Sequence, residues 1–166
     1  MADEPRRKKT AKTESLTIRL DPKTRFALEF VARVRGQTIT KVIEQEIIKV
    51  ADETEILAGD SPSNSVCWRS YWDVNEGVRY LQIANDALTN PTYEEEEVID
   101  FVRQHWKFFS TDARLQNLKR DNIEVLWPMM PHFMEWWREK KSSDRSFVFS
   151  MMNHALAEAG LDVILP

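Results

Sequence analysis

Residues 15–51 read SLTIRLDPKTRFALEFVARVRGQTITKVIEQEIIKVA, and this stretch decides the fold. Its first six residues alternate between polar and apolar side chains, which is the pattern of a β-strand with one buried face. The apolar face consists of Leu16, Ile18 and Leu20, and the polar face of Ser15, Thr17 and Arg19. The sequence therefore predicts a strand over residues 15–20, and no other segment carries a comparable strand pattern.

Two helices are expected after this strand. Asp21 is a suitable N-cap and Pro22 favours the first helical position, so the first helix is predicted over residues 22–35, ending at Gly36. Thr38 is placed to cap a second helix that ends near Ala51. An apolar stripe at helical spacing runs along the second helix and consists of Ile39, Val42, Ile43, Ile47 and Val50.

A strand and two helices of this size rarely bury enough apolar surface to fold alone, and a single strand leaves both of its edges unpaired. Antiparallel pairing of residues 15–20 with the same segment of a second chain solves both problems, because it gives a two-stranded ribbon over four helices. We therefore predict an intertwined homodimer. Its core is expected to contain Leu16, Ile18, Leu20, Leu28, Val31, Val42, Ile43 and Ile47.

The polar face of such a ribbon fits the major groove of DNA. Residues 15–51 resemble the ribbon-helix-helix family of the Arc and methionine-repressor type. The resemblance rests on LTIRL followed by Asp-Pro, on Leu28-x-x-Val31-Ala32-x-x-x-Gly36, and on Gly36-x-Thr38-x-Thr40-x-Val42-Ile43. It implies that bases are read by Ser15, Thr17 and Arg19. It also implies that a DNA phosphate is held at the start of the second helix, by Thr38, Ile39 and Thr40, where free backbone N–H groups attract anions.

Further basic side chains near this surface are candidate phosphate contacts. Within the first helix and at the start of the second they are Lys23, Arg25 and Lys41. Residues 1–14 lack apolar periodicity and are predicted to be a flexible basic arm that contacts DNA. Its cations are Arg6, Arg7, Lys8, Lys9 and Lys12. Since Ser15 is short, Arg19 is expected to dominate base reading through the O6 and N7 atoms of guanine.

The first helix has a second apolar row, Phe26, Phe30 and Val34, on a side that a minimal ribbon-helix-helix dimer leaves in water. Large exposed apolar patches are uncommon on soluble proteins. We predict that the C-terminal domain or another dimer covers this row.

The net charge of −4 conceals an asymmetry. Residues 1–50 carry 12 basic and 7 acidic side chains, whereas residues 51–166 carry 11 basic and 20 acidic ones. Residues 52–65 are rich in Gly, Asp, Ser, Pro and Asn and are predicted to be a linker. Residues 66–166 contain all six Trp and are predicted to be an acidic all-α domain. The fold class expected for the chain is therefore mainly α.

Five segments of the C-terminal domain are predicted to be helical. The first begins at Asp73-x-x-Glu76, and the second at the capping-box pattern Thr92-x-x-Glu95. The remaining three are a short segment near residues 112–118, an interrupted one over 123–140, and a last one over 144–159 that ends at Gly160.

Other kinds of site have little support. The three histidines, His105, His132 and His154, show no metal-ligand spacing, and Cys67 is the sole cysteine. We therefore expect no metal, no cofactor and no disulfide, and His105 is predicted to be a hydrogen-bonded core residue. No catalytic motif is present, so an enzyme is not expected. The Trp-rich region is more simply explained as core, with a small-molecule site as the alternative.

These patterns favour a homodimeric, sequence-specific DNA-binding regulator, a repressor of bacterial, phage or plasmid type in the cytoplasm and associated with the nucleoid. Three roles are open for the C-terminal domain: it oligomerises the protein, for example to a tetramer, it senses a small-molecule effector, or it binds a protein partner. No membrane partner is expected. The alternatives are an architectural protein of plasmid partition or conjugative transfer, an antitoxin whose C-terminal domain binds a toxin, and an interaction module without DNA binding.

Overall fold

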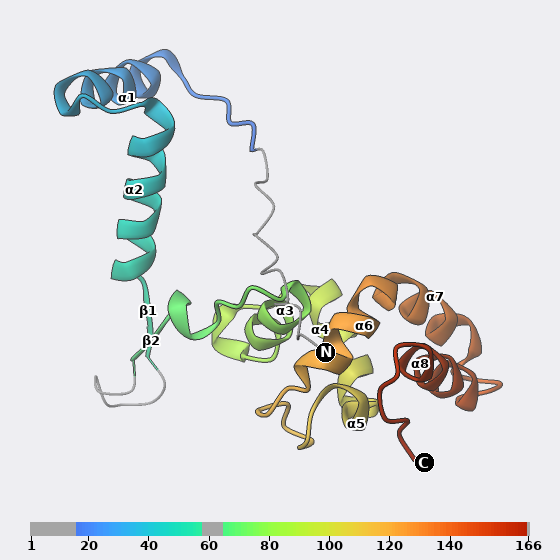
Figure 1. The fold of residues 1–166 in the computed structure, drawn as a ribbon. Coiled ribbons are helices and arrows are strands. Elements are labelled where there is room, and N and C mark those ends of the chain that lie inside the picture. Colours follow the sequence, from blue (N-terminus) through green and yellow to red (C-terminus); the bar gives the residue numbers. More distant parts are fainter. Residues whose placement is uncertain (1–15, 58–64, 166) are drawn as a thin grey trace, which may run out of the picture. The chain divides into compact units, whose positions relative to one another are not determined.

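The computed structural model describes residues 16–57 and 65–165 of the 166-residue chain (Figure 1). The chain divides into two compact units, residues 1–55 and 56–166, and each is described by itself. The division falls inside the predicted linker, residues 52–65. The basic arm, residues 1–14, and Ser15 lie outside the described residues.

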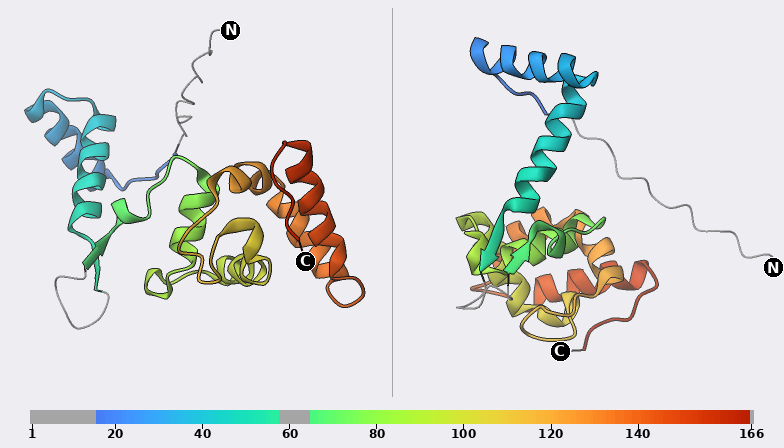
Figure 2. Two further views of the ribbon diagram at one scale, coloured as in Figure 1. Left: turned by 60° about the horizontal axis from the view of Figure 1, so that its bottom comes forward. Right: turned by 90° about the vertical axis from the view of Figure 1, so that its left-hand side faces the viewer.

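The N-terminal unit is built on two helices, α1 (Pro22–Arg35) and α2 (Ile39–Glu53). Both predicted N-caps are confirmed: a carboxylate oxygen of Asp21 accepts the Lys23 and Thr24 N–H groups at 2.9 and 3.1 Å, and the Thr38 hydroxyl accepts the Lys41 N–H at 3.2 Å. Gly36 ends α1 in the left-handed region at φ 62°, a conformation that L side chains rarely adopt. The helices run in clearly different directions, and this short turn joins them (Figure 2).

Residues 16–20 form no strand in this single chain, so the predicted strand at 15–20 is not formed here. A strand exists through its ladder of backbone hydrogen bonds, and the predicted ladder needs a second copy of the same segment. The side chains of Leu16, Ile18 and Leu20 are 80, 51 and 42% exposed.

Two strands occur where the sequence predicted none. They are β1 (Glu55–Leu57) and β2 (Ser65–Cys67), which pair in a two-stranded sheet. The prediction that 52–65 is wholly linker and that the C-terminal domain is all-α is therefore wrong at these residues. Each strand has only three residues, too few to show an alternating pattern in a polar segment.

The C-terminal unit is otherwise helical (Figure 1). Its 3₁₀ turns are η2 (Trp68–Ser70), η3 (Ala87–Thr89) and η4 (Trp127–Met129). Its α-helices are α3 (Glu76–Ala84), α4 (Tyr93–Gln104), α5 (Trp106–Phe109), α6 (Arg120–Leu126), α7 (Met130–Lys140) and α8 (Ser146–Glu158). The capping box of Thr92 and Glu95 is confirmed at the start of α4, and Gly160 follows the end of α8 at φ 73°.

Two local predictions in this unit are wrong. Asp73 does not cap α3, because Asn75 does, and the Asp73 carboxylate forms a two-pronged ion pair with Arg120 on α6. Residues 112–118 form a loop instead of a helix. The Asp112 carboxylate accepts the N–H groups of Arg114, Gln116 and Asn117 at 2.8 to 3.3 Å, and such side-chain bonds compete with helix formation.

The core of the C-terminal unit is aromatic and aliphatic. Its largest fully buried side chains include Phe101, Phe108, Phe109, Phe133, Leu126 and Met152. Neighbouring helices α7 and α8 lie side by side, and α6 contacts both α3 and α8. Gly77 on α3 allows close packing, because a Cβ at this position would lie 2.6 Å from Ile123 Cγ2 and 2.6 Å from Trp127 Cγ.

Candidate nucleic-acid interface

The residues predicted to read DNA bases lie in the extended segment before α1. Thr17 and Arg19 are exposed, and Ser15 lies outside the described residues. Alternation along an extended chain separates Thr17 and Arg19 from Leu16, Ile18 and Leu20. As a strand, the segment would therefore present a hydroxyl and a guanidinium on one side and aliphatic side chains on the other.

An apolar groove of about 600 Å³ lies open in the N-terminal unit. Its aliphatic lining consists of Ile18, Leu20, Leu28, Val42, Ile43, Ile47, Val50 and Ala51. Six of these belong to the predicted dimer core. The predicted dimer core omits Val50 and Ala51, although Val50 continues the apolar stripe of α2. Leu16 and Val31, also assigned to the core, do not line the groove.

The start of α2 has the electrostatics of an anion site. The first intrahelical bond is made by the Val42 N–H to the Thr38 carbonyl, and the Lys41 N–H is held by the Thr38 hydroxyl. Ile39 and Thr40 come before Lys41 and Val42 in the chain. At the start of a helix the backbone N–H groups of such residues have no carbonyl acceptor within the helix. Together with the positive end of the helix dipole they can hold a phosphate oxygen.

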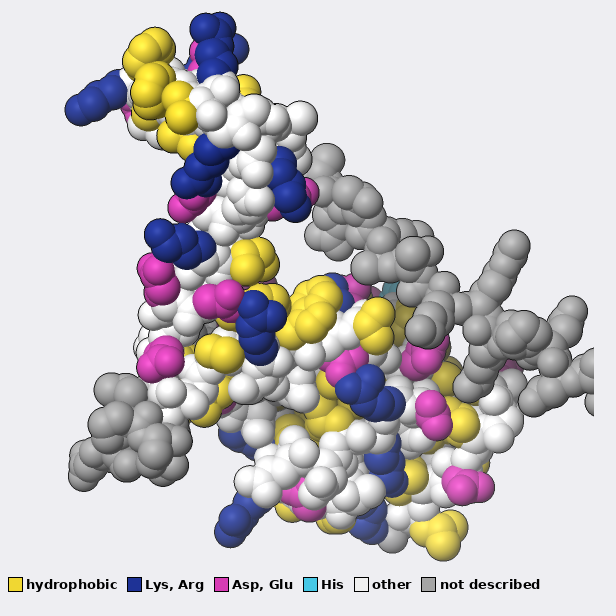
Figure 3. All heavy atoms as spheres, turned by 60° about the vertical axis from the view of Figure 1, so that its left-hand side comes forward, with side chains coloured by type: hydrophobic (Ala, Val, Ile, Leu, Met, Phe, Trp, Pro, Cys, Tyr) yellow, Lys and Arg dark blue, Asp and Glu magenta, His cyan; other side chains and the backbone are white. Residues whose placement is uncertain are grey.

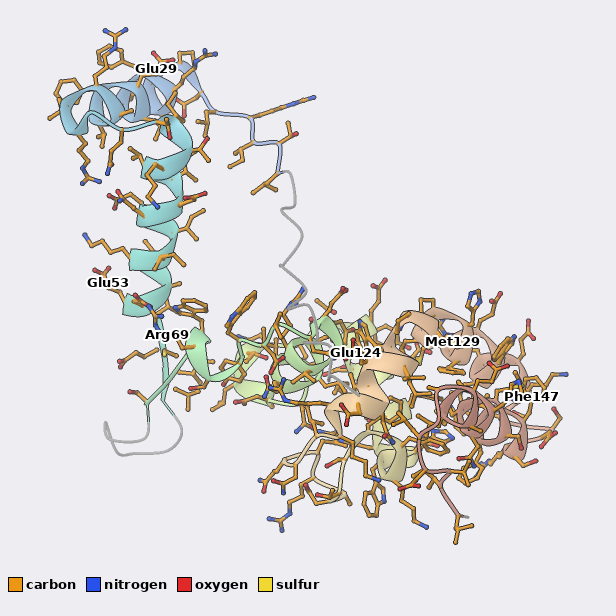
Figure 4. The ribbon with its side chains drawn as sticks, viewed as in Figure 1. Glu29, Glu53, Arg69, Glu124, Met129 and Phe147 are labelled. Atoms are coloured by element: carbon orange, nitrogen blue, oxygen red, sulfur yellow. The ribbon has the colours of Figure 1, made fainter. Side chains whose placement is uncertain are left out.

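The predicted phosphate-contacting cations differ in their surroundings. Arg25 pairs at 3.0 Å with Glu29, which lies one turn along α1 and is labelled in Figure 4. Lys41 pairs with Glu44 at 3.5 Å on α2. Lys23 has no ion pair among the described residues. A neighbouring carboxylate partly neutralises a cation, so of the three side chains the Lys23 ammonium keeps its positive charge least offset by a described neighbour. Residues 16–50 nevertheless carry seven basic against four acidic side chains.

The second apolar row of α1 is exposed in the described chain. Phe26, Phe30 and Val34 are 70, 58 and 69% exposed. Figure 3 shows hydrophobic side chains gathered along α1 with Lys and Arg side chains around them. The prediction that the C-terminal domain or another dimer covers this row remains a prediction.

The three histidines lie in separate surroundings. His105 is half-buried, and its Nδ1 lies 2.9 Å from the Phe101 carbonyl oxygen. Its ring packs against Phe101 and Trp137. These contacts confirm the predicted role of His105 as a hydrogen-bonded residue of the core. His132 stacks on Trp136, and His154 lies 3.4 Å from Glu158. No group of three His, Cys, Asp or Glu side chains in the described ranges could hold a metal ion.

Burial of His105 gives a pH-dependent contribution to stability. Desolvation lowers the pKa of His105 below its usual 6.5, and the bond to Phe101 opposes this shift. The unfolded chain therefore binds a proton more readily than the folded chain, so the free energy of unfolding falls as the pH drops below about 6.5. We expect urea unfolding to show a steeper loss of stability between about pH 7.5 and 5.5 in the parent than in His105→Gln.

The exposed His154 provides the control for this experiment. A His154→Gln variant removes an imidazole that is 65% exposed, so it shows the effect of losing a histidine at a surface position. Equal slopes in the parent and His105→Gln would contradict the assignment to His105.

Comparison with known proteins adds no family to these observations. No family model matches the chain, and no curated protein or solved structure matches it significantly. None of the helices in the described residues is both long and apolar enough to cross a membrane.

Proposed function

We propose that the chain is a homodimeric, sequence-specific DNA-binding protein of the ribbon-helix-helix type that represses transcription. In this proposal residues 15–20 of two chains pair into a ribbon that enters the major groove. Thr17 and Arg19, with Ser15, read base edges, while the Ile39 and Thr40 N–H groups at the start of α2 hold phosphates.

The observation that carries this proposal is the apolar groove beside the extended segment. Ile18 and Leu20 line it together with residues of both α1 and α2. An open apolar surface of this kind favours association. A second copy brings three more aliphatic side chains, Leu16, Ile18 and Leu20. The backbone N–H and C=O groups of that segment also need hydrogen-bond partners. Ribbon pairing satisfies those backbone groups and covers the groove in one step.

The sign of the local charge supports DNA as the ligand. The polar side of the segment carries Arg19, Lys23 follows at the start of α1, and the chain before residue 15 is basic. The C-terminal unit carries the acidic excess, which DNA repels. The DNA-binding surface is therefore assigned to the N-terminal unit alone.

The test begins with selection of a preferred duplex from random DNA sequences by the full-length protein. Arg19→Ala is expected to weaken binding to the selected duplex by about 1–3 kcal/mol and to relax the preference for guanine at one position per half-site. Binding is measured by fluorescence anisotropy at several salt concentrations.

Lys23→Ala distinguishes phosphate contact from base reading. It is expected to weaken binding to all duplexes alike and to reduce the salt slope by about one unit. If Arg19→Ala binds the selected duplex as tightly as the parent, or if the parent selects no sequence, the ribbon-reading proposal is wrong.

A further inference from the structure

A second cavity, open to solvent, lies in the C-terminal unit, and its volume is about 640 Å³. Three helical faces meet around it. Glu76 and Tyr80 are four residues apart on α3, and Glu94 and Val98 are four residues apart on α4, so each pair shares one face of its helix. The third face belongs to η4, marked by Met129 in Figure 4, and to α7.

The interior of this cavity is apolar and aromatic. Met130 and Met134 line it and are themselves buried, and Val98 is half-buried beside them. The rings of Tyr80 and Trp127 pack against each other with centroids 4.8 Å apart at 50°. A cavity of this size with a mostly apolar lining is typical of a small-molecule site.

Charges at the same cavity are strongly unbalanced. Arg138 lines it, but its guanidinium forms a two-pronged pair with Glu97, with Nε 2.8 Å from the carboxylate. Glu76 and Glu94 also line it, and neither has an ion-pair partner in the described part of the chain. Both carboxylates lie in the first turn of a helix. Glu94 also interacts electrostatically with Arg138, whose charge is already paired with Glu97. The exposed rim of the cavity therefore carries more negative than positive charge.

The negative field reaches the aromatic wall. Burial raises the pKa of Tyr80, and the carboxylates of Glu95 and Glu94 raise it further. Both effects disfavour a negative charge on the phenol oxygen. The same field attracts a cation placed beside Tyr80 and Trp127, whose π-electrons add to the attraction.

We propose that this cavity binds a small organic cation, an ammonium group attached to an apolar body. The ammonium group lies between Glu76 and Glu94 against the rings of Tyr80 and Trp127, and the apolar body contacts Met130 and Met134. A bare metal ion fits less well, because only two carboxylates come from the lining, whereas Ca²⁺ takes six to eight oxygen ligands. This proposal is independent of DNA binding by the N-terminal unit.

Three soluble probes of similar shape test the proposal on the full-length protein. They are phenethylamine, which is cationic, 2-phenylethanol, which is neutral, and phenylacetate, which is anionic. Isothermal titration calorimetry is expected to show binding of the amine, binding of the alcohol at least about tenfold weaker, and no binding of phenylacetate up to about 10 mM. Equal affinity for amine and alcohol, or no binding of the amine, would overturn the proposal.

Matched glutamine variants assign the site. The double variant Glu76→Gln with Glu94→Gln keeps the side-chain shape and removes both charges. We expect it to bind the amine at least about tenfold more weakly than the parent and to leave binding of the alcohol unchanged. Glu96→Gln is the control, because Glu96 lies in the same first turn of α4 but outside the cavity lining.

Unchanged amine binding in the double variant, or an equal loss in Glu96→Gln, would show that the cavity is not the site. Circular dichroism and thermal unfolding establish that each variant is folded before titration. The comparison of the three probes on the parent needs no variant, so it tests the proposal even if the double variant unfolds.

Discussion

Ile18→Glu is expected to leave the full-length protein monomeric at concentrations where we expect the parent to be a dimer. In one chain the Ile18 side chain is 51% exposed and lines the apolar groove of the N-terminal unit. Dimer formation would bury this position twice, so the variant loses the burial of two isoleucines and places two carboxylates in an apolar interface. We expect the dimer dissociation constant to rise by at least about a thousandfold. Sedimentation equilibrium over a range of concentrations measures it.

Thr17→Glu is the matched control, since it introduces the same charge one residue away on the polar side of the segment. It is expected to remain dimeric and to lose DNA binding, because a carboxylate then enters the major groove of a negatively charged duplex. The ribbon dimer is refuted if Ile18→Glu sediments like the parent, or if the parent itself is monomeric at about 100 µM, well above typical specific dimer affinities.

Gly77→Val is expected to destabilise the C-terminal unit by about 3 kcal/mol or more. Even a single Cβ at this position would lie 2.6 Å from Ile123 Cγ2 and from Trp127 Cγ. Ile123 is fully buried and Trp127 is half-buried, and both contacts lie close to the side-chain stems, so neither can move away cheaply. All six Trp lie in this unit, so Trp fluorescence during urea unfolding reports on it selectively.

Gly77→Ala separates packing from helix propensity. Alanine favours a helix by roughly 1 kcal/mol over glycine, so an exposed position would be stabilised by this change. At residue 77 the clash should outweigh that gain, and the variant should be less stable than the parent. A stabilised Gly77→Ala protein would show that α3 and α6 are not held as closely as described.

Local signals explain which parts of the fold the sequence could predict. The caps at Asp21, Thr38 and Thr92 depend on hydrogen bonds within three residues, so a short pattern contains all the necessary information. Asp73 carries a similar signal but pairs with Arg120, 47 residues later. The loop at 112–118 depends on Leu115, which adopts a positive φ of 60° and buries its side chain.

The two candidate sites also differ in how much of each a local sequence pattern contains. The polar and apolar sides of residues 15–20 follow from alternation, yet the ribbon itself needs a second chain. The organic-cation cavity draws Glu76, Glu94 and Trp127 from three segments distant in sequence. No spacing rule connects such residues, so this cavity could be found only in three dimensions.

Cys67, the single cysteine of the chain, lies half-buried in β2. A thiol-specific spin label would therefore attach at one position per chain, with no engineering to remove other thiols. A monomer would give no dipolar signal between labels, whereas a symmetric dimer would give one distance. Pulsed electron paramagnetic resonance of the labelled protein, with and without DNA, would then report how far apart the two C-terminal units lie.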